Sequence, residues 1–96
     1  MRVRYRELAL SDLDNIFRYL DERSPAGARN VMDAIHAVVG DIAQNPLGAR
    51  RTSDPTVRVK VVARYGYKIL YSVEADAIEI LHVRLGARRP WPAERR

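Results

Sequence analysis

The fold is decided by the stretch VRVKVVARYGYKILYSV, which occupies residues 57–73. Apolar and polar side chains alternate on both sides of its Tyr65-Gly66 turn, a period of two that is typical of strands with one buried face. A third run of this kind, Ile78 to Leu85, follows after a short turn. The C-terminal half of the chain therefore predicts three consecutive antiparallel strands.

Two amphipathic helices are indicated before this sheet region. The first is predicted from the capping-box spacing of Ser11 and Asp14 and from an apolar stripe at helical spacing, namely Leu13, Ile16, Phe17 and Leu20. The second begins at Ser24-Pro25, an N-cap followed by proline, and ends at Asn45-Pro46. A short link between two such helices favours an antiparallel hairpin.

A short strand, Val3 to Leu8, is expected before the first helix because Val3 and Tyr5 alternate with arginines. The element order is then β-α-α-β-β-β. This is an α+β fold in which the helical hairpin packs on one face of a mainly antiparallel sheet. The 96 residues suit one domain, residues 1–96.

The composition is that of a basic, soluble chain. Seventeen Lys and Arg against 12 Asp and Glu give a formal charge of +5, which favours acidic partners such as nucleic acid or an acidic protein segment. The chain has no cysteine, which suits a reducing compartment, and we expect the cytoplasm. No apolar run suggests a signal peptide or a membrane anchor.

Sequence motifs for cofactors are missing as well. There is no phosphate-binding glycine loop, HExxH or calcium-loop spacing. We therefore expect no metal site and no cofactor. The carboxylates of the first helical region are interpreted as capping and solubility residues: Asp12, Asp14, Asp21 and Glu22.

If the hairpins keep the alternation aligned, the even positions of the last three strands share the face that the helices leave open. They include most of the basic residues of this half: Arg58, Lys60, Arg64, Lys68, Ser72, His82 and Arg84. Two interpretations stay open, a basic binding surface or an ordinary solvated face with scattered charge. A bulge in any strand would break the pattern.

The two histidines receive different interpretations. His36 lies at the edge of the second helix's apolar stripe, where a structural role is expected. His82 and Arg84 are two residues apart on one strand face, so imidazole and guanidinium could address one phosphate. A ribonuclease that uses the substrate's 2′-hydroxyl needs a base, an acid and a cation. A packed or surface histidine is the alternative.

The last predicted strand runs into Gly86-Ala87-Arg88-Arg89-Pro90-Trp91, with Trp91 the single tryptophan of the chain. Residues 86–96 are interpreted as a basic C-terminal extension that presents a binding surface. Two alternatives remain, a disordered basic tail or a tryptophan that caps the core.

Several short segments recur in this order in a known group of proteins: Ala9 to Ile16 with Tyr19-Leu20, Ser24-Pro25-Ala26, Asn45 to Arg50, Val57-Arg58, Tyr67 to Tyr71, Ile78 to Arg84, and Ala87-Arg88. Together they cover nearly the whole chain. With this set the sequence resembles the RelE/ParE superfamily of toxins from bacterial type II toxin-antitoxin systems. Its segment pattern is most similar to the ParE branch, the plasmid stabilisation proteins.

The resemblance implies a toxin held inactive in a hetero-oligomer with a ParD-like antitoxin encoded beside it. Such an antitoxin lays an acidic segment along the helical hairpin and sheet. ParE-like members poison DNA gyrase, whereas RelE-like members cleave mRNA on the ribosome. A domain that retains only antitoxin binding is a third possibility.

We expect a gyrase-binding toxin without catalytic residues, which contacts its target through Arg84, Arg88, Arg89 and Trp91. In the nuclease alternative, RNA would be bound and cut by Arg58, Lys60, Arg64, His82 and Arg84. The nuclease branch generally uses an aromatic residue or a histidine near the chain's end. Here no tyrosine follows Tyr71, and Leu85 stands where many members have histidine, so the gyrase interpretation is favoured.

The antitoxin is expected to contact Leu13, Phe17, Val31, Ile35, Arg58 and Lys60. The first four residues should flank an apolar groove that the toxin alone does not fully close. If all four were buried in the toxin's own core, the partner would have to bind elsewhere.

Overall fold

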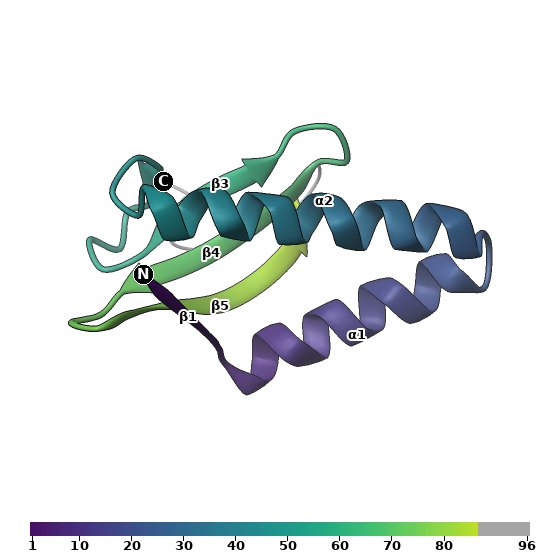
Figure 1. Ribbon diagram of the computed structural model, residues 1–96, viewed down its shortest axis with the longest axis horizontal. Coiled ribbons are helices and arrows are strands. Elements are labelled where there is room, and N and C mark those ends of the chain that lie inside the picture. Colours follow the sequence, from purple (N-terminus) through teal and green to yellow (C-terminus); the bar gives the residue numbers. More distant parts are fainter. Residues whose placement is uncertain (87–96) are drawn as a thin grey trace.

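A helical hairpin packs on one face of a five-stranded sheet (Figure 1). The computed structural model describes residues 1–86. Its elements are β1 Arg2–Tyr5, α1 Glu7–Asp21, α2 Pro25–Gln44, β2 Arg50–Arg51, β3 Arg58–Val62, β4 Tyr67–Val73 and β5 Ala77–Leu85. The α+β class is confirmed, and the short strand β2 is added to the expected element order. No helix of the described part is long and apolar enough to cross a membrane.

The strands are ordered β1-β5-β4-β3-β2 across the sheet. β1 runs parallel to β5, and the other neighbours are antiparallel. A parallel pair needs a crossover connection, and the chain from α1 to β4 supplies it here. Strands β1 and β5, the first and last of residues 1–86, therefore lie side by side.

The start of α1 differs from the prediction. The helix begins at Glu7, ahead of the proposed capping box at Ser11, and no side chain caps it. The capping-box interpretation was therefore wrong. The preceding strand also ends earlier than expected, at Tyr5. The Arg6 N–H donates a hydrogen bond to the Ile80 carbonyl at 3.0 Å, so the neighbouring strand fixes the point where the helix starts.

The boundaries of α2 confirm the prediction from local signals. The Gly27 N–H donates to the Ser24 side-chain oxygen at 3.0 Å, and Pro25 opens the helix. This bond satisfies one of the backbone donors that every helix start leaves unpaired. The helix ends at Gln44, directly before Asn45-Pro46.

The prediction that the even-numbered residues of the last three strands share the open face is wrong for β3. Val62 pairs with Tyr67, and Arg58 pairs with Tyr71, so even positions of β3 share a face with odd positions of β4. Paired residues of an antiparallel ladder lie on the same face. Because the turn between the strands has an even number of residues, each even-numbered residue of β3 is paired with an odd-numbered residue of β4. Arg58 and Lys60 therefore stand on the helix side of the sheet.

A bulge in β5 again changes which face the even-numbered residues occupy. Tyr71 pairs with Ile80, whereas Leu70 pairs with His82, which leaves Leu81 as the extra residue. The bulge moves the odd-numbered Val83 onto the helix side and Arg84 onto the other side, opposite Lys68. Even-position basic residues thus reach the open face in β4 and late β5 but not in β3.

Two separate apolar clusters result from this register. The larger cluster lies between the helices and the sheet, and its buried members are Ala9, Val31, Ile35, Val39, Ile42, Val62, Ile69, Tyr71, Ile78, Ile80 and Val83. The smaller cluster, on the opposite side of the sheet, consists of Val57, Val59, Leu70 and Leu81. We call that opposite side the open face.

Candidate functional site

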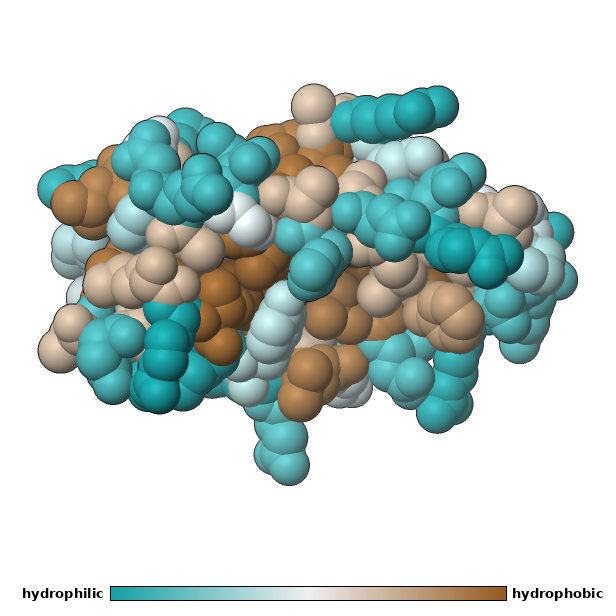
Figure 2. All heavy atoms as spheres, in the orientation of Figure 1, coloured by the Kyte–Doolittle hydropathy of each residue, from teal (hydrophilic) through white to brown (hydrophobic). Residues whose placement is uncertain are grey.

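The helical hairpin leaves a hollow of about 290 Å³ at its surface. The hollow is lined by Tyr5, Leu13, Met32, Asp33, Ile35 and His36. Figure 2 views the molecule from the helix side and shows hydrophobic atoms gathered toward the middle of that face, with hydrophilic atoms around them. An apolar floor with a polar rim suits a partner's hydrophobic side chains.

Two of the four predicted groove residues are accessible. Phe17 is 40% exposed and Leu13 is half-buried. Val31 and Ile35, by contrast, are only 5% and 3% exposed and belong to the core, although Ile35 still lines the hollow. The four residues are therefore not all buried, but Phe17 and Val31 do not line the hollow, and antitoxin binding at these residues stays a prediction.

Arg58 holds the loop that follows α2. Its Nη1 donates to the carbonyl oxygens of Leu47 and Ala49 at 3.2 and 2.9 Å. The same loop is held by Tyr71, whose hydroxyl donates to the Pro46 carbonyl at 2.6 Å. Burial raises the pKa of Tyr71, and nearby Arg58 partly offsets this. Arg58 therefore donates hydrogen bonds within the domain, which leaves fewer of its N–H groups for a partner.

A contact between α1 and β5 was missed in the sequence. Asp12 Oδ2 accepts a hydrogen bond from the Val83 N–H at 3.0 Å and lies 3.1 Å from His82 Nδ1. β1 ends its pairing with β5 at Ile80, so the Asp12 carboxylate occupies the place of a continuing strand. Asp12 is therefore a structural residue that caps the sheet edge, and its interpretation as an exterior solubility residue was wrong. Nothing in the sequence pairs it with His82, since 70 positions separate the two.

A second hollow, of about 340 Å³, lies where α1 meets the end of β5. Its lining includes Ile16, Tyr19, Tyr67 and Leu85. Tyr19 and Leu85 are exposed. The pKa of Tyr67 is raised, first by burial and then by the neighbouring Tyr19. This apolar and aromatic corner adjoins the end of the described chain.

The candidate nuclease residues are not brought together. Lys60 stands on the helix side of the sheet, paired with Ile69, while His82 and Arg84 pair with open-face residues of β4. Arg64 lies in the turn after β3, where its guanidinium stands 5.5 Å from the Tyr65 ring centroid. An acid, a base and a cation that act on one phosphate must converge on it, and this set is divided between two faces and a turn.

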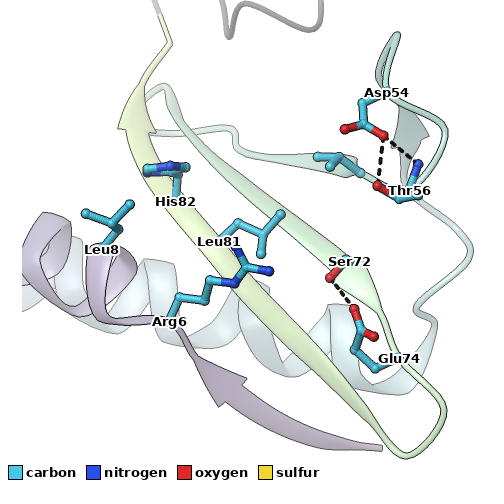
Figure 3. A pocket seen from close by; sticks show the side chains of 9 residues that line it. Arg6, Leu8, Asp54, Thr56, Ser72, Glu74, Leu81 and His82 are labelled. Atoms are coloured by element: carbon cyan, nitrogen blue, oxygen red, sulfur yellow. Dashed lines mark hydrogen bonds between the residues drawn. The ribbon is translucent and has the colours of Figure 1, made fainter.

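A hollow of about 480 Å³ lies on the open face. Figure 3 shows its lining side chains on one side of the sheet with α2 behind: Arg6, Leu8, Asp54, Thr56, Val57, Ser72, Glu74, Leu81 and His82. Two carboxylates of the rim are held in place. Asp54 accepts from the Thr56 N–H and hydroxyl at 2.9 and 2.8 Å, which lowers its pKa, and Glu74 accepts from the Ser72 hydroxyl at 2.8 Å.

Three of the predicted target-binding residues, Arg88, Arg89 and Trp91, lie outside the described residues. The fourth, Arg84, is exposed near the end of β5. Within residues 1–86, no group of three or more His, Cys, Asp or Glu side chains could hold a metal ion.

Comparison with known proteins gives three matches. The model of the family described as ParE toxin of type II toxin-antitoxin system, parDE, matches residues 3–90. A protein of Sinorhizobium fredii named "Putative toxin Y4kP" is 33% identical over 91 residues, which is 95% of this chain and 93% of that protein. The fold is similar to a chain of a solved structure titled "Chromosomal ParDE TA system from P. aeruginosa", with a TM-score of 0.78 and 23% identity.

That structural match covers 88% of this chain and 95% of the other. The family match extends from β1 past the end of β5, so it includes both helices and all five strands described within residues 1–86. This chain belongs to the ParE family of toxins of type II toxin-antitoxin systems.

Proposed function

We propose that this toxin inhibits DNA gyrase and is neutralised by a ParD-like antitoxin that binds the helical hairpin. The observation that supports the antitoxin site is the apolar hollow on the helical hairpin, which Leu13 lines, together with the exposed Phe17 four residues further along α1. The toxin's formal charge of +5 suits an acidic antitoxin segment. Both proteins would act in the cytoplasm.

Gyrase is the target that the ParE resemblance implies. The competing proposal, mRNA cleavage on the ribosome, is not supported by the arrangement of the candidate nuclease residues on different faces. His82 Nδ1 also lies 3.1 Å from the Asp12 carboxylate, which accepts a hydrogen bond from the Val83 N–H at the edge of the sheet. A binding toxin needs no convergent acid and base, so inhibition of gyrase by binding is the simpler action.

The target is tested with purified components. DNA supercoiling by gyrase is measured with and without the toxin, and mRNA integrity is measured beside it in a translating extract. We expect loss of supercoiling with intact mRNA. Cleaved message with normal supercoiling would overturn the proposal, and the absence of both effects would favour a domain that retains only antitoxin binding.

The antitoxin site is tested by Phe17→Asp. A charge placed in the apolar contact should weaken antitoxin binding by about tenfold or more, because a buried unpaired carboxylate is strongly unfavourable. Val61→Asp is the matched control, since Val61 is similarly exposed but lies on the open face. Binding is measured by titration calorimetry with the antitoxin encoded beside the toxin. Equal weakening by both substitutions would remove the hairpin as the binding site.

A further inference from the structure

The hollow on the open face owes part of its apolar lining to the bulge in β5. Side chains normally alternate between the two faces of a strand, but the extra residue Leu81 and its neighbour His82 both line the hollow. Val57 adds to the apolar lining, and so does Leu8 of α1, which is 60% exposed. Bulges that re-aim a side chain in this way are common beside active sites. The bulge thus enlarges the apolar surface that a bound group can contact.

The charged groups of the hollow are separated by sign. Figure 3 shows Arg6 extending from the β1–α1 junction across β5. Asp54 and Glu74 come from the opposite side, the first from the loop between β2 and β3 and the second from the turn between β4 and β5. A bound molecule therefore meets a cation on one side of the hollow and two carboxylates on the other.

Both carboxylates are held in place by neighbouring side chains. Asp54 Oδ1 accepts both of the bonds from Thr56, and Glu74 Oε2 accepts from Ser72, which is only 7% exposed. The bonds from Thr56 also lower the pKa of Asp54, which keeps this carboxylate charged. These hydrogen bonds use one oxygen of each carboxylate. Because the groups are already ordered, pairing with a partner's base costs them little conformational freedom.

Arg6 is positioned by its backbone and by one ion pair. Its N–H donates to the Ile80 carbonyl at 3.0 Å, and its Nε lies 3.3 Å from Glu79 Oε1. The side chain nevertheless remains 57% exposed. A guanidinium carries five N–H donors in a fixed fork, and the pair with Glu79 engages the Nε end. The two terminal nitrogens can therefore donate to a carboxylate that enters the hollow.

This lining favours a protein segment over nucleic acid. A phosphate backbone carries only negative charge and would be repelled by Asp54 and Glu74. An extended peptide presents alternate side chains to one side, so acidic, apolar and basic residues at alternate positions can address all three parts of the lining. The volume of about 480 Å³ lies within the range of about 300–1,000 Å³ typical of small-ligand pockets, which suits a few side chains.

We propose that the open-face hollow binds such a segment of the toxin's protein target. The segment's carboxylate lies at Arg6, its apolar side chain on Val57 and Leu81, and its base beside Asp54 and Glu74. This inference rests on the proposed function, in which the target is the protein gyrase. The hollow lies on the face opposite the helical hairpin, so target and antitoxin contact different surfaces.

Charge reversal on each side of the hollow tests the site in the supercoiling assay with purified gyrase. Asp54→Lys combined with Glu74→Lys should raise the toxin concentration for half-inhibition by about tenfold or more, because like charges then face each other. Arg6→Glu alone should have an effect of the same size on the opposite side of the hollow. Circular dichroism shows whether each variant is folded, and calorimetry should show unchanged binding to the antitoxin encoded beside the toxin.

The matched controls reverse the same charges at exposed positions of the helices. They are Asp21→Lys combined with Asp41→Lys, and Arg29→Glu. Both controls should inhibit supercoiling as the wild-type toxin does.

The outcomes separate this inference from the function on which it rests. If the wild-type toxin inhibits gyrase and every folded variant inhibits equally, the hollow is not the target site, while the proposed function stands. If the wild-type toxin does not inhibit gyrase, both are overturned. Weaker antitoxin binding by the hollow variants would assign the hollow to the antitoxin. Stronger inhibition by the two lysine substitutions would indicate a phosphate backbone in the hollow, and either result rejects a target segment as the occupant.

Discussion

The helix-covered face and the open face belong to the same five strands but are closed in different ways. On the helix side, Ile35 and Val39 of α2 join Ile69 and Tyr71 of the sheet in one continuous core. On the open side, a cluster of only four buried residues is accompanied by charged pairs such as Arg6–Glu79, whose closest atoms are 3.3 Å apart. The first face has the character of a domain core and the second that of an interface.

This difference indicates where the stability of the toxin resides. The helices that cover one face satisfy their own backbone hydrogen bonds, so the core is closed by elements that are already ordered. The open face, by contrast, has a buried cluster of only four residues. Changes on the helix side should therefore unfold the domain more readily, while changes on the open side should mainly alter binding.

The sharpest test uses two neighbours in β4, Ile69 and Leu70, which are both fully buried but face opposite sides. We expect Ile69→Ala to lower the free energy of unfolding by about 4 kcal/mol, in the upper part of the range for large-to-small core changes. Leu70→Ala should lower it by about 2 kcal/mol, in the lower part of that range, because its cluster has only three other buried members. Urea denaturation measures both. Equal losses would mean that the two faces are equally firmly packed, and the comparison would fail.

Asp12 of α1 supplies the hydrogen-bond acceptor for β5 where the pairing with β1 has ended. Asp12→Ala leaves the Val83 N–H without its acceptor and should lower the free energy of unfolding by about 2 kcal/mol. Asp14→Ala is the matched control on the same helix. Its exposed pair with Arg18, 2.9 Å apart, should contribute about 0.5 kcal/mol or less. Thermal and urea unfolding measure both variants, and similar small losses would show that the sheet edge does not need this carboxylate.

Local signals in the sequence predicted the two helices and the element order, apart from the short strand β2, but not the pairing of β1 with β5. Ser24-Pro25 and Asn45-Pro46 mark the ends of α2 because capping and the missing proline N–H act within a few residues. The start of α1 could not be predicted in this way. It is fixed by the bond from Arg6 to Ile80, which is a contact of tertiary structure.

The faces of the strands were the weakest part of the prediction. Alternation shows that a strand has two faces, but the number of turn residues and the bulge at Leu81 decide which face is which. Arg58 and Lys60 were therefore assigned to the open face and lie on the other. The contact of Asp12 with His82 has no local signature at all, because it joins the first helix to the last strand.

The smallest expected effect concerns a polar group at the edge of the helix-covered core. Tyr71→Phe removes the hydrogen bond to the Pro46 carbonyl and should lower the free energy of unfolding by about 1 kcal/mol at neutral pH. Tyr19→Phe, an exposed control, should change it by less than about 0.5 kcal/mol. Chemical denaturation at neutral pH checks both values.

The pH dependence distinguishes this buried hydroxyl from surface groups. Burial raises the pKa of Tyr71 above its ordinary value of 10.0, so folding favours the protonated phenol. This contribution is fully present below pH 10.0 and is lost as the pH rises through the higher pKa of the folded state. Tyr71→Phe should therefore make the decline in stability above pH 10.0 shallower, with the remaining slope from Tyr5 and Tyr67, whose pKa values burial also raises. Unchanged slopes in unfolding measured from pH 8 to 11 would mean that the hydroxyl is solvated, and that the helix-covered face is open to water at the Pro46 loop.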